Sequence, residues 1–435
     1  MKRVIVIGSD FAPSSYPPAL RIQCYVRHLP EFGWQPTVVT IDPQYYEWPV
    51  DPENQKLLPE HLQVIRTKAL PVELTRKIGI GDLGLRTLWQ HWRTASRLCK
   101  NKEADLVFIP VPPCSPAVLG RLLHELFGVP YVIDYIDPWV TMNYWQLPRA
   151  QRPLKRTLSY ALSVFLEPFA LKKVGHIVGV SKGTTDYVVS RYPWLSESDA
   201  TEIPYGGEAA DFEYVRRNPR RNNIFNRNDG FLHVSYVGRG GSDMVPALTA
   251  IFQAVKLGLQ RSPSLFSRLR LHFVGTTYAA NANGLYWARP IAQQAGLEDY
   301  VNEHPGRVSY LDALQILVDS HALLVPGSDQ SHYTASKIFP YILARRPLLA
   351  VFNEASSVVT VLRETQAGPV VTFDSQCPPT ARVEDILNHL EKILSLPAGY
   401  QPPVRWEAFE SYSARSMTAR LGAALDTALD KNNRR

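Results

Sequence analysis

The sequence has few of the features that mark metal sites, disulfide frameworks or membrane spans. Its cysteines lie far apart and form no C-x-x-C motif; they are Cys24, Cys99, Cys114 and Cys377. We therefore expect neither a zinc site nor a disulfide framework, and the chain suits a reducing compartment. No run approaches the ~20 apolar residues that cross a bilayer. The best candidate, residues 160–171, is interrupted by Glu167 and Pro168.

Charge and composition exclude two further classes. The 435 residues include 47 Lys+Arg and 40 Asp+Glu, a net charge of +7, and the basic residues are dispersed along the chain. This small, scattered excess does not indicate a nucleic-acid partner. A hydrophobic fraction of 45% is typical of folded domains and not of disorder. The length predicts two or three domains. The first apolar run, residues 4–7, is too short for a secretion signal.

What the first half contains is an alternation of short apolar runs and helical patterns. The runs are β-branched and continuous, at 4–8, 37–41, 106–109, 131–135 and 177–181. Such runs are typical of strands buried on both faces in a parallel sheet. The segments 17–32, 83–98 and 116–127 between them have helical spacing. The first half is therefore predicted to be a doubly wound α/β domain.

The second half repeats this architecture. Strands are expected at 233–238, 271–275, 322–326, 348–352 and 370–373, and a helix over 406–429. We predict one domain at 1–205 and a second at 206–404. The polar, basic run 216–230 predicts an exposed linker at about 210–230. The alternative is a basic patch for an anionic surface.

The loop after the first expected strand is a candidate ligand site. Open α/β sheets bind ligands outside the carboxyl ends of their strands. The loop has no G-x-G-x-x-G, so a dinucleotide fingerprint is absent. Ser14 and Ser15 either cap the following helix or contact a ligand. Arg21, one turn into that helix, either forms a surface salt bridge or meets an anion.

Two carboxylates stand at the end of the strand at 131–135. Pro138 stops the strand directly after Asp137. Asp137 is therefore expected at the rim of the sheet, facing an interdomain cleft. A carboxylate there can bind sugar hydroxyls or accept a proton. Asp134 is expected to cap or anchor a neighbouring loop.

The second half has a glycine-rich turn between a strand and a helix. Residues 238–241 read Gly-Arg-Gly-Gly. Glycines leave backbone N–H groups open, and a helix N-terminus favours anions. Arg239 adds a guanidinium suited to phosphate. The alternative is a plain tight turn.

The segment from 325 to 341 also leaves a strand and enters a helix. Thr334 and Ser336 supply hydroxyls and Lys337 supplies an ammonium group in the first turn. A cation at a helix N-terminus is unfavourable unless an anion binds there. The mismatch predicts a phosphate beside Lys337. His332, on the preceding loop, is no more expected to be a ligand contact than an ordinary solvated side chain.

Taken together, these motifs resemble retaining glycosyltransferase family four, whose enzymes use nucleotide-sugar donors and have the GT-B fold. The matching segments are 11–13 with 19–21, 29–34, 38–40, 134–139, 177–181, 203–208 and 336–347. The resemblance implies two Rossmann-like domains facing a cleft, with the C-terminal helix at 405–435 returning to the first. It also implies a hexosyltransferase-like enzyme that transfers sugar with retention.

The resemblance further implies roles for particular residues. The second domain would hold a nucleoside-diphosphate sugar, and the first domain would hold a glycan or lipid-linked acceptor. Arg239 and Lys337 would stabilise the leaving diphosphate without a metal or cofactor, and Asp137 would lie near the transferred sugar. The donor-binding residues would be Gly238, Gly240, Gly241, Thr334, Ser336 and Tyr341. The acceptor side would include Ser14, Ser15 and Arg21.

The chain departs from the family pattern near the donor. His332 and Pro340 stand in place of two glutamates, the second of which holds the nucleotide ribose in the family, and Val245 replaces a lysine. The alternative function is therefore a relative that binds a nucleotide or glycan without turnover. An epimerase of the same fold is less favoured, because no acid–histidine set is arranged for proton abstraction.

Two segments are basic and amphipathic, at 86–102 and 149–173. Tryptophan, leucine and basic residues together suit the interface of an anionic bilayer. The alternative is ordinary packing of helices on the first sheet. We expect a cytoplasmic protein, with peripheral contact to the inner face of the cytoplasmic membrane left open. Such contact would fit a lipid-linked acceptor and a role in surface or exopolysaccharide biosynthesis.

Overall fold

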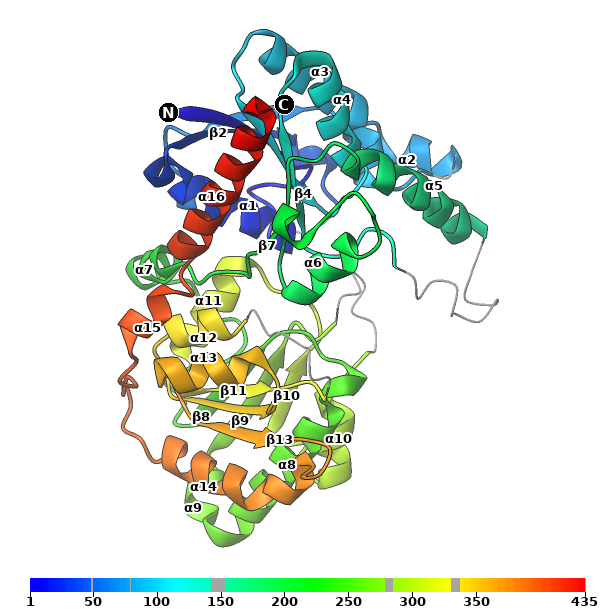
Figure 1. Cartoon of the computed structure of the whole chain (residues 1–435). Helices are drawn as coiled ribbons and strands as arrows, with labels where there is room; N and C mark the ends of the chain where they lie inside the picture. The colour runs from blue at the N-terminus through cyan, green and yellow to red at the C-terminus, as the bar shows by residue number, and fades with distance from the viewer. Residues whose placement is uncertain (48–49, 79, 142–153, 278–284, 330–336, 435) are drawn as a thin grey trace. The chain divides into compact units, whose positions relative to one another are not determined.

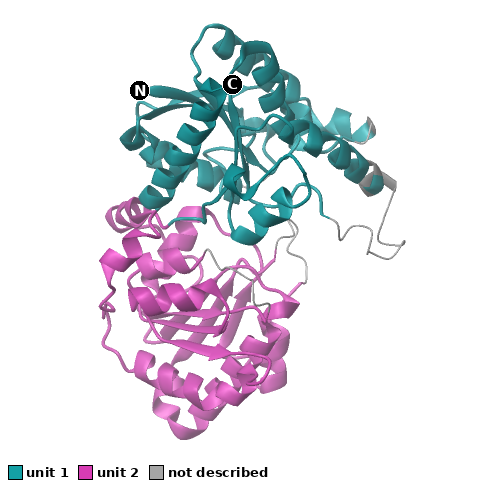
Figure 2. Cartoon of the chain, in the orientation of Figure 1, with its two compact units in different colours: residues 1–206, 414–435 teal, residues 207–413 magenta. Residues whose placement is uncertain are grey.

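The protein, described by a computed structural model, divides into two compact units. The structure describes all residues except 48–49, 79, 142–153, 278–284, 330–336 and 435. Unit 1 comprises Met1–Gly206 and Ala414–Arg435, and unit 2 comprises Gly207–Ser413 (Figure 2). Each unit is a parallel sheet with helices on its faces. The predicted pair of Rossmann-like domains of the GT-B type is confirmed.

Unit 1 is built on a seven-stranded sheet with the order β3-β2-β1-β4-β5-β6-β7. Every strand pair in it is parallel. The strands are β1 (Lys2–Ile7), β2 (Trp34–Ile41), β3 (Gln63–Thr67), β4 (Leu106–Val111), β5 (Tyr131–Tyr135), β6 (His176–Gly179) and β7 (Ala200–Glu202). β4 and β5 are buried along their whole length, as expected for central strands covered on both faces.

Helices cover both faces of this sheet (Figure 1). They are α1 (Pro17–His28), α2 (Val72–Thr75), α3 (Leu83–Lys100), α4 (Ala117–Phe127), α5 (Leu154–Leu171), α6 (Lys182–Val189) and α16 (Ala414–Asn433). One apolar core joins the sheet to α3, α4 and α5. A second core joins the opposite face to α1 and α16. No helix in the described part of the chain is both long and apolar enough to cross a membrane.

Unit 2 is built on a six-stranded parallel sheet with the order β10-β9-β8-β11-β12-β13. The strands are β8 (Leu232–Val237), β9 (Leu269–Val274), β10 (Val301–His304), β11 (Ala322–Pro326), β12 (Leu348–Asn353) and β13 (Val370–Phe373). The helices are α7 (Ala209–Arg217), α8 (Val245–Arg261), α9 (Pro263–Phe266), α10 (Ala288–Ala295), α11 (Tyr310–Asp319), α12 (Ile338–Leu343), α13 (Ser357–Thr365), α14 (Val383–Leu394) and α15 (Trp406–Glu410).

Three strands were not predicted from the sequence, and all three lie at sheet edges. They are β3, β7 and β10. Their sequences, QVIRT, ATE and VNEH, mix polar with apolar residues. An edge strand pairs on one side only and is partly open to water, so it lacks the continuous apolar run that identified the central strands.

The predicted linker at about 210–230 is wrong in its conformation. Residues 209–217 form α7, whose Phe212 and Val215 are buried. The segment after α7 is attached to α11: the backbone N–H of Arg220 donates to Gln315 at 2.9 Å, and Asn222 donates to Asp319 at 3.3 Å. The abundance of arginine and asparagine suggested a linker, but the backbone of Arg220 and the side chain of Asn222 bond the segment to α11.

The returning C-terminal helix is confirmed, and it begins later than predicted. α15 belongs to unit 2, and α16 belongs to unit 1, where it packs against α1 (Figure 1). Leu421 and Leu425 of α16 are fully buried in the second core. The indole N–H of Trp34 donates to Asp426 at 2.9 Å, and Lys2 pairs with the same carboxylate.

A buried ion pair joins distant parts of unit 1. The Arg21 guanidinium on α1 donates to both carboxylate oxygens of Asp134 on β5, at 2.7 and 3.0 Å. It also donates to the carbonyls of Ile203 and Pro204, at 2.7 and 3.2 Å. Burial by itself would lower the pKa of Arg21, but the Asp134 carboxylate raises it above the usual value. A fully satisfied pair of this kind fixes helix, strand and following loop together.

Asp134→Ala is expected to destabilise unit 1 by about 3 to 5 kcal/mol, because it leaves the Arg21 charge buried without a partner. Denaturant unfolding followed by tryptophan fluorescence measures this loss. The matched control is Asp186→Ala, which removes an exposed pair with Lys182 and should change stability little. Equal effects of the two substitutions would show that the buried pair has no special role.

Candidate active site

Arg21 is fully engaged within unit 1, which corrects its predicted place on the acceptor side. Its side chain is 2% exposed, and its guanidinium lies within 5.0 Å of the Tyr25 ring centroid and 5.2 Å of that of Tyr205. With Asp134 and two backbone carbonyls bound, its donors are used internally. Arg21 therefore positions the segment at 203–204 and is not placed to contact a ligand. Asp134 anchors that segment through Arg21, in agreement with the expectation that it anchors a neighbouring loop.

The hydroxyls of Ser14 and Ser15 also stabilise the loop that carries them. Ser14 is completely buried and accepts the backbone N–H of Tyr16 at 3.2 Å. Ser15 accepts from the Asn54 amide at 3.0 Å. The structure therefore does not support an acceptor contact through Ser14, and Ser15 is at least partly committed to Asn54. Neither serine is the N-cap residue of α1, because that position is Tyr16.

Asp10 is a residue that the sequence did not single out. It follows β1 and is 3% exposed, and burial raises the pKa of its carboxyl to about 6, against a lowering hydrogen bond from Ser14. Its Oδ1 has no hydrogen-bond partner among the described residues. The signal in the sequence is an acidic residue three positions after a buried strand. A buried carboxyl of this kind is half protonated near pH 6.

Asp137 lies two residues beyond β5, at the carboxyl edge of the unit 1 sheet. The residue is exposed, yet partial burial of its carboxyl raises its pKa. It follows the strand that Asp134 fixes, so its backbone is well anchored. This carboxyl can accept hydrogen bonds from sugar hydroxyls, and its catalytic role stays a prediction.

In unit 2, Arg239 is oriented by a neighbouring carboxylate. Its guanidinium forms two hydrogen bonds with Asp243, at 2.9 and 2.7 Å. Hydrogen bonding to Arg239 lowers the pKa of Asp243, and Ser328 contributes a further hydrogen bond. The planar fork of Arg239 is therefore held in one orientation. Its charge is partly balanced before any ligand arrives.

Lys337, directly before α12, is a cation whose pKa lies far below its usual value. Burial, together with the smaller effect of the charges of Arg239 and Arg307, lowers the pKa of its ammonium to about 7. Its Nζ lies against the glycine turn, since a methyl group on Gly238 would be 2.8 Å from it. Within the described residues no carboxylate forms a salt bridge with Lys337. Arg307, between β10 and α11, was missed because no local motif surrounds it.

The glycine turn does not offer all of its amides to a ligand, which corrects the expected phosphate cradle. The N–H of Gly238 donates to Val274 at 2.8 Å, and that of Gly240 donates to Thr276 at 2.7 Å. A methyl group on Gly241 would meet Arg239 and Asp243 within 2.5 Å. The glycines therefore allow close approach of side chains around the turn. The cations whose charges act on Lys337 at this turn are Arg239 and Arg307.

Tyr341 positions β8. It is 1% exposed, and its hydroxyl accepts the N–H of Val237 at 2.6 Å and donates to the Val237 carbonyl at 3.2 Å. It therefore fixes the strand that precedes Gly238. Its hydroxyl is bonded to the backbone, so the predicted contact of Tyr341 with the sugar donor is not supported. Thr334, Ser336 and His332 lie outside the described residues.

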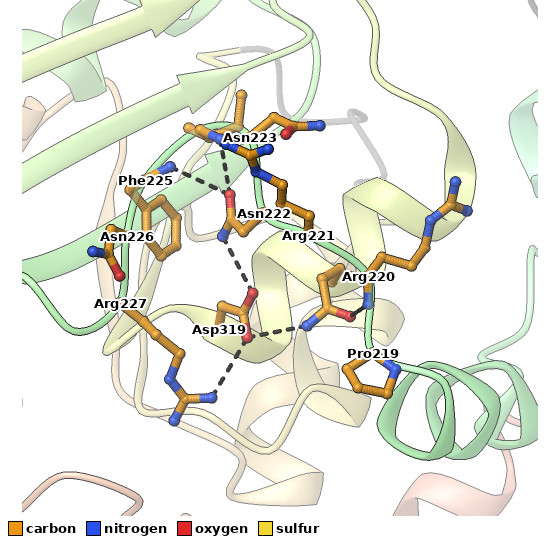
Figure 3. Close-up of a pocket in the computed structure, with 11 residues that line it drawn as sticks. Pro219, Arg220, Arg221, Asn222, Asn223, Phe225, Asn226, Arg227 and Asp319 are labelled. Carbon is orange, nitrogen blue, oxygen red and sulfur yellow. Dashed lines mark hydrogen bonds and ion pairs between the residues drawn. The ribbon is translucent and has the colours of Figure 1, made fainter.

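The basic segment of unit 2 borders a pocket of about 620 Å³ against α11 (Figure 3). Arg220 pairs with Asp312 at 3.0 Å and Arg227 lies 3.6 Å from Asp319. Asp319 also accepts from Gln315 at 3.0 Å. Carboxylates thus neutralise much of this segment's charge, and its polar side chains serve to attach it to α11.

Comparison with known proteins gives a family for unit 1. Residues 18–206 match the family model described as glycosyl transferase 4-like domain. This match spans most of unit 1, which is therefore similar to a glycosyl transferase 4-like domain. The resemblance inferred from the motifs is thereby confirmed, and the chain is a glycosyltransferase. No curated protein matches the sequence significantly.

Solved structures show the same fold over the whole chain. HepE of Anabaena, in complex with UDP and glucose, is 12% identical with a TM-score of 0.57 and covers 98% of this chain and 100% of its own. A trehalose-phosphate synthase from Burkholderia xenovorans is 11% identical with a TM-score of 0.56, covering 98% and 100%. A glycosyltransferase from Rickettsia africae is 12% identical with a TM-score of 0.54, covering 100% and 97%. At this identity the likeness concerns the fold.

Lys337→Met is expected to stabilise the protein more at pH 6 than at pH 9. Folding lowers the pKa of Lys337 from 10.5 to about 7. Between pH 7 and pH 10.5 this lysine is therefore protonated in the unfolded chain but largely neutral in the folded protein. The free energy of unfolding of the wild-type protein therefore falls as the pH decreases from 10.5 to 7, and a methionine at this position avoids that loss. Thermal unfolding at both pH values measures the difference. The control Lys256→Met, at an exposed position of α8, should show no such dependence, and a pH-independent effect of Lys337→Met would contradict the assignment.

Proposed function

We propose that the protein transfers a sugar from a nucleoside-diphosphate sugar to a hydroxyl of a glycan or lipid-linked acceptor, with retention at the anomeric carbon. The observation that supports this most is the group formed by Lys337, Arg239 and Arg307 in unit 2. These cations lie close enough to lower the pKa of Lys337. A bound anion would offset the burial and the like-charge repulsion that lower the pKa of Lys337.

A diphosphate is the anion that suits this group. When the bond between sugar and diphosphate breaks, negative charge grows on the leaving oxygens. Lys337 and Arg307 would meet that charge, and Arg239 would present its oriented guanidinium beside them. An incoming diphosphate would also raise the pKa of Lys337 and keep it protonated at neutral pH. The chain's own cations would thus stabilise the leaving group without a resident metal.

Asp137 is proposed to act on the sugar. Its carboxyl stands at the carboxyl edge of the unit 1 sheet, and its raised pKa indicates an environment that favours the neutral form. A hydrogen bond from a sugar hydroxyl would satisfy one of its oxygens and orient the ring. UDP-glucose is the first donor to test, because HepE has been solved with it. The second candidate, nucleotide binding without turnover, would show as donor binding with no transfer.

We further propose that unit 1 contacts an anionic membrane, where a lipid-linked acceptor would reside. α5 exposes Leu162, Val164 and Phe165, the last 72% exposed. α3 exposes Trp89, 65% exposed, beside Arg93 and Arg97 on the same helix. Both helices border the same face of the sheet, and Lys172 and Lys173 follow α5. Exposed apolar side chains flanked by lysine and arginine suit an anionic interface.

Part of the predicted basic surface is otherwise engaged. Arg86 is buried, donates to the Leu70 carbonyl at 2.8 Å and pairs with Glu47 at 2.6 Å. It therefore cannot face a membrane. Residues 149–153 lie outside the described residues. The proposed surface accordingly consists of the exposed side chains on α3 and α5 with the two lysines after α5.

Lys337→Ala is expected to reduce transfer from the nucleotide sugar by about 100-fold or more, as loss of one group that stabilises developing charge typically does. Product formation and its anomeric configuration, read by NMR, check both turnover and retention. Lys256→Ala serves as the control, since it removes an exposed lysine of the same unit. Wild-type rates in Lys337→Ala would refute the diphosphate assignment, and an inverted product would refute retention.

Phe165→Ser is expected to weaken binding to anionic vesicles, because it removes the most exposed of the large apolar side chains described on α5. Flotation with phosphatidylglycerol vesicles at low salt measures the bound fraction. Leu285→Ser is the matched control: Leu285 is 54% exposed but belongs to unit 2. If the wild-type protein stays in the soluble fraction, membrane contact through this surface is wrong.

A further inference from the structure

Trp287 stands where three loops of the donor-side sheet meet. It directly precedes α10 and is half-buried. Its neighbours come from β8, β9 and β10, which lie side by side in the sheet (Figure 1). Gly240 follows β8, Thr276 follows β9 and Glu303 belongs to β10. Ligands of open α/β sheets bind at this carboxyl edge.

The indole lies directly against the glycine turn. A methyl group on Gly240 would be 2.3 Å from Cδ1 of Trp287 and 2.5 Å from Cγ. Any side chain at position 240 would therefore displace the ring. Gly240 is also fixed by its N–H, which donates to the Thr276 carbonyl at 2.7 Å. The turn that places Lys337 beside Gly238 thus places Trp287 beside Gly240, two residues away.

Glu303 holds the backbone of Trp287 in place. Its carboxylate accepts the N–H of Trp287 and of Ala288, both at 2.9 Å, and that of Arg289 at 2.8 Å. It also accepts the Thr276 hydroxyl at 2.6 Å. A carboxylate at a helix N-terminus is favourable, so this arrangement is stable without a ligand. The indole is therefore positioned before any ligand binds, which reduces the ordering cost of binding.

We propose that the Trp287 indole is the surface on which the nucleobase of the donor stacks. This inference rests on the proposed function and names the group that recognises the nucleoside part of the substrate. A nucleobase is joined to its diphosphate through one ribose, so its site must lie near the Lys337 group. A partly exposed aromatic ring at the same turn meets that requirement. Every base has a π face, so stacking favours a nucleotide over a bare diphosphate without choosing among bases.

The competing explanation is that Trp287 only fills space over Gly240. The two explanations differ in what a base-free probe detects. A packing residue that shapes the turn would affect nucleotide and pyrophosphate alike, because both use Lys337. A stacking residue would affect only the probe that carries a base.

The test measures binding of UDP and of pyrophosphate by calorimetry, with GDP and ADP as further probes. Trp287→Ala should weaken UDP binding about tenfold or more and leave pyrophosphate binding within twofold. Trp287→Phe should keep most of the UDP affinity, since phenylalanine also stacks. Gly240→Ala, which displaces the indole without removing it, should reproduce the nucleotide-selective loss. Lys337→Ala should weaken both probes.

The outcomes separate this inference from the proposed function. The stacking role alone would be overturned if the wild-type protein binds UDP and Trp287→Ala binds it equally well. It would also be overturned if Trp287→Ala weakens UDP and pyrophosphate binding to the same extent. Absence of wild-type binding to all three nucleotides would overturn the proposed function and this inference with it.

Discussion

The geometry of unit 1 depends on the need to neutralise one buried charge. Arg21 and Asp134 are both inaccessible to water, so each would be very costly without the other. Their pairing fixes α1 against β5, and the remaining donors of Arg21 fix the chain at 203–204. Asp137 lies three residues after Asp134, so the pair also sets where this candidate catalytic carboxyl stands. The residues that order the site are thus different from those available to a ligand.

Unit 2 treats its charges in the opposite way. Arg239 is oriented by Asp243, but Lys337 is partly buried near two arginines, and its pKa falls accordingly. In unit 1 a carboxylate pairs with the buried cation, whereas in unit 2 no carboxylate of the described residues forms a salt bridge with Lys337, and the proposed diphosphate would bring negative charge to it. Burying Lys337 near other positive charges lowers the stability of the folded protein. Such a cost is typical of sites that stabilise charge in a transition state.

The sequence allowed the central strands to be predicted, because burial on both faces demands continuous apolar runs. It did not allow the edge strands β3, β7 and β10 to be predicted, because one open side admits polar residues. Lys337 was found from a local conflict, a cation at the start of a helix. The partner of Arg21 lies 113 residues away, so neither its burial nor its internal role leaves a local pattern. The segment at 210–230 was misread for the same reason, since its polar side chains bond to distant residues of α11.

At 12% identity the likeness to solved structures concerns the fold, so the proposed nucleotide contacts come from this chain's own residues. In the family that it resembles, a glutamate is expected to hold the ribose, and here the third residue of α12 is Pro340, which has no carboxylate. A site without that contact must hold the nucleoside by other means or bind it weakly. Trp287, fixed by Glu303 and lying on Gly240, provides an aromatic surface in the same unit. Stacking needs only a flat face and proximity to the diphosphate, so it can replace a directed hydrogen bond at the cost of selectivity among bases.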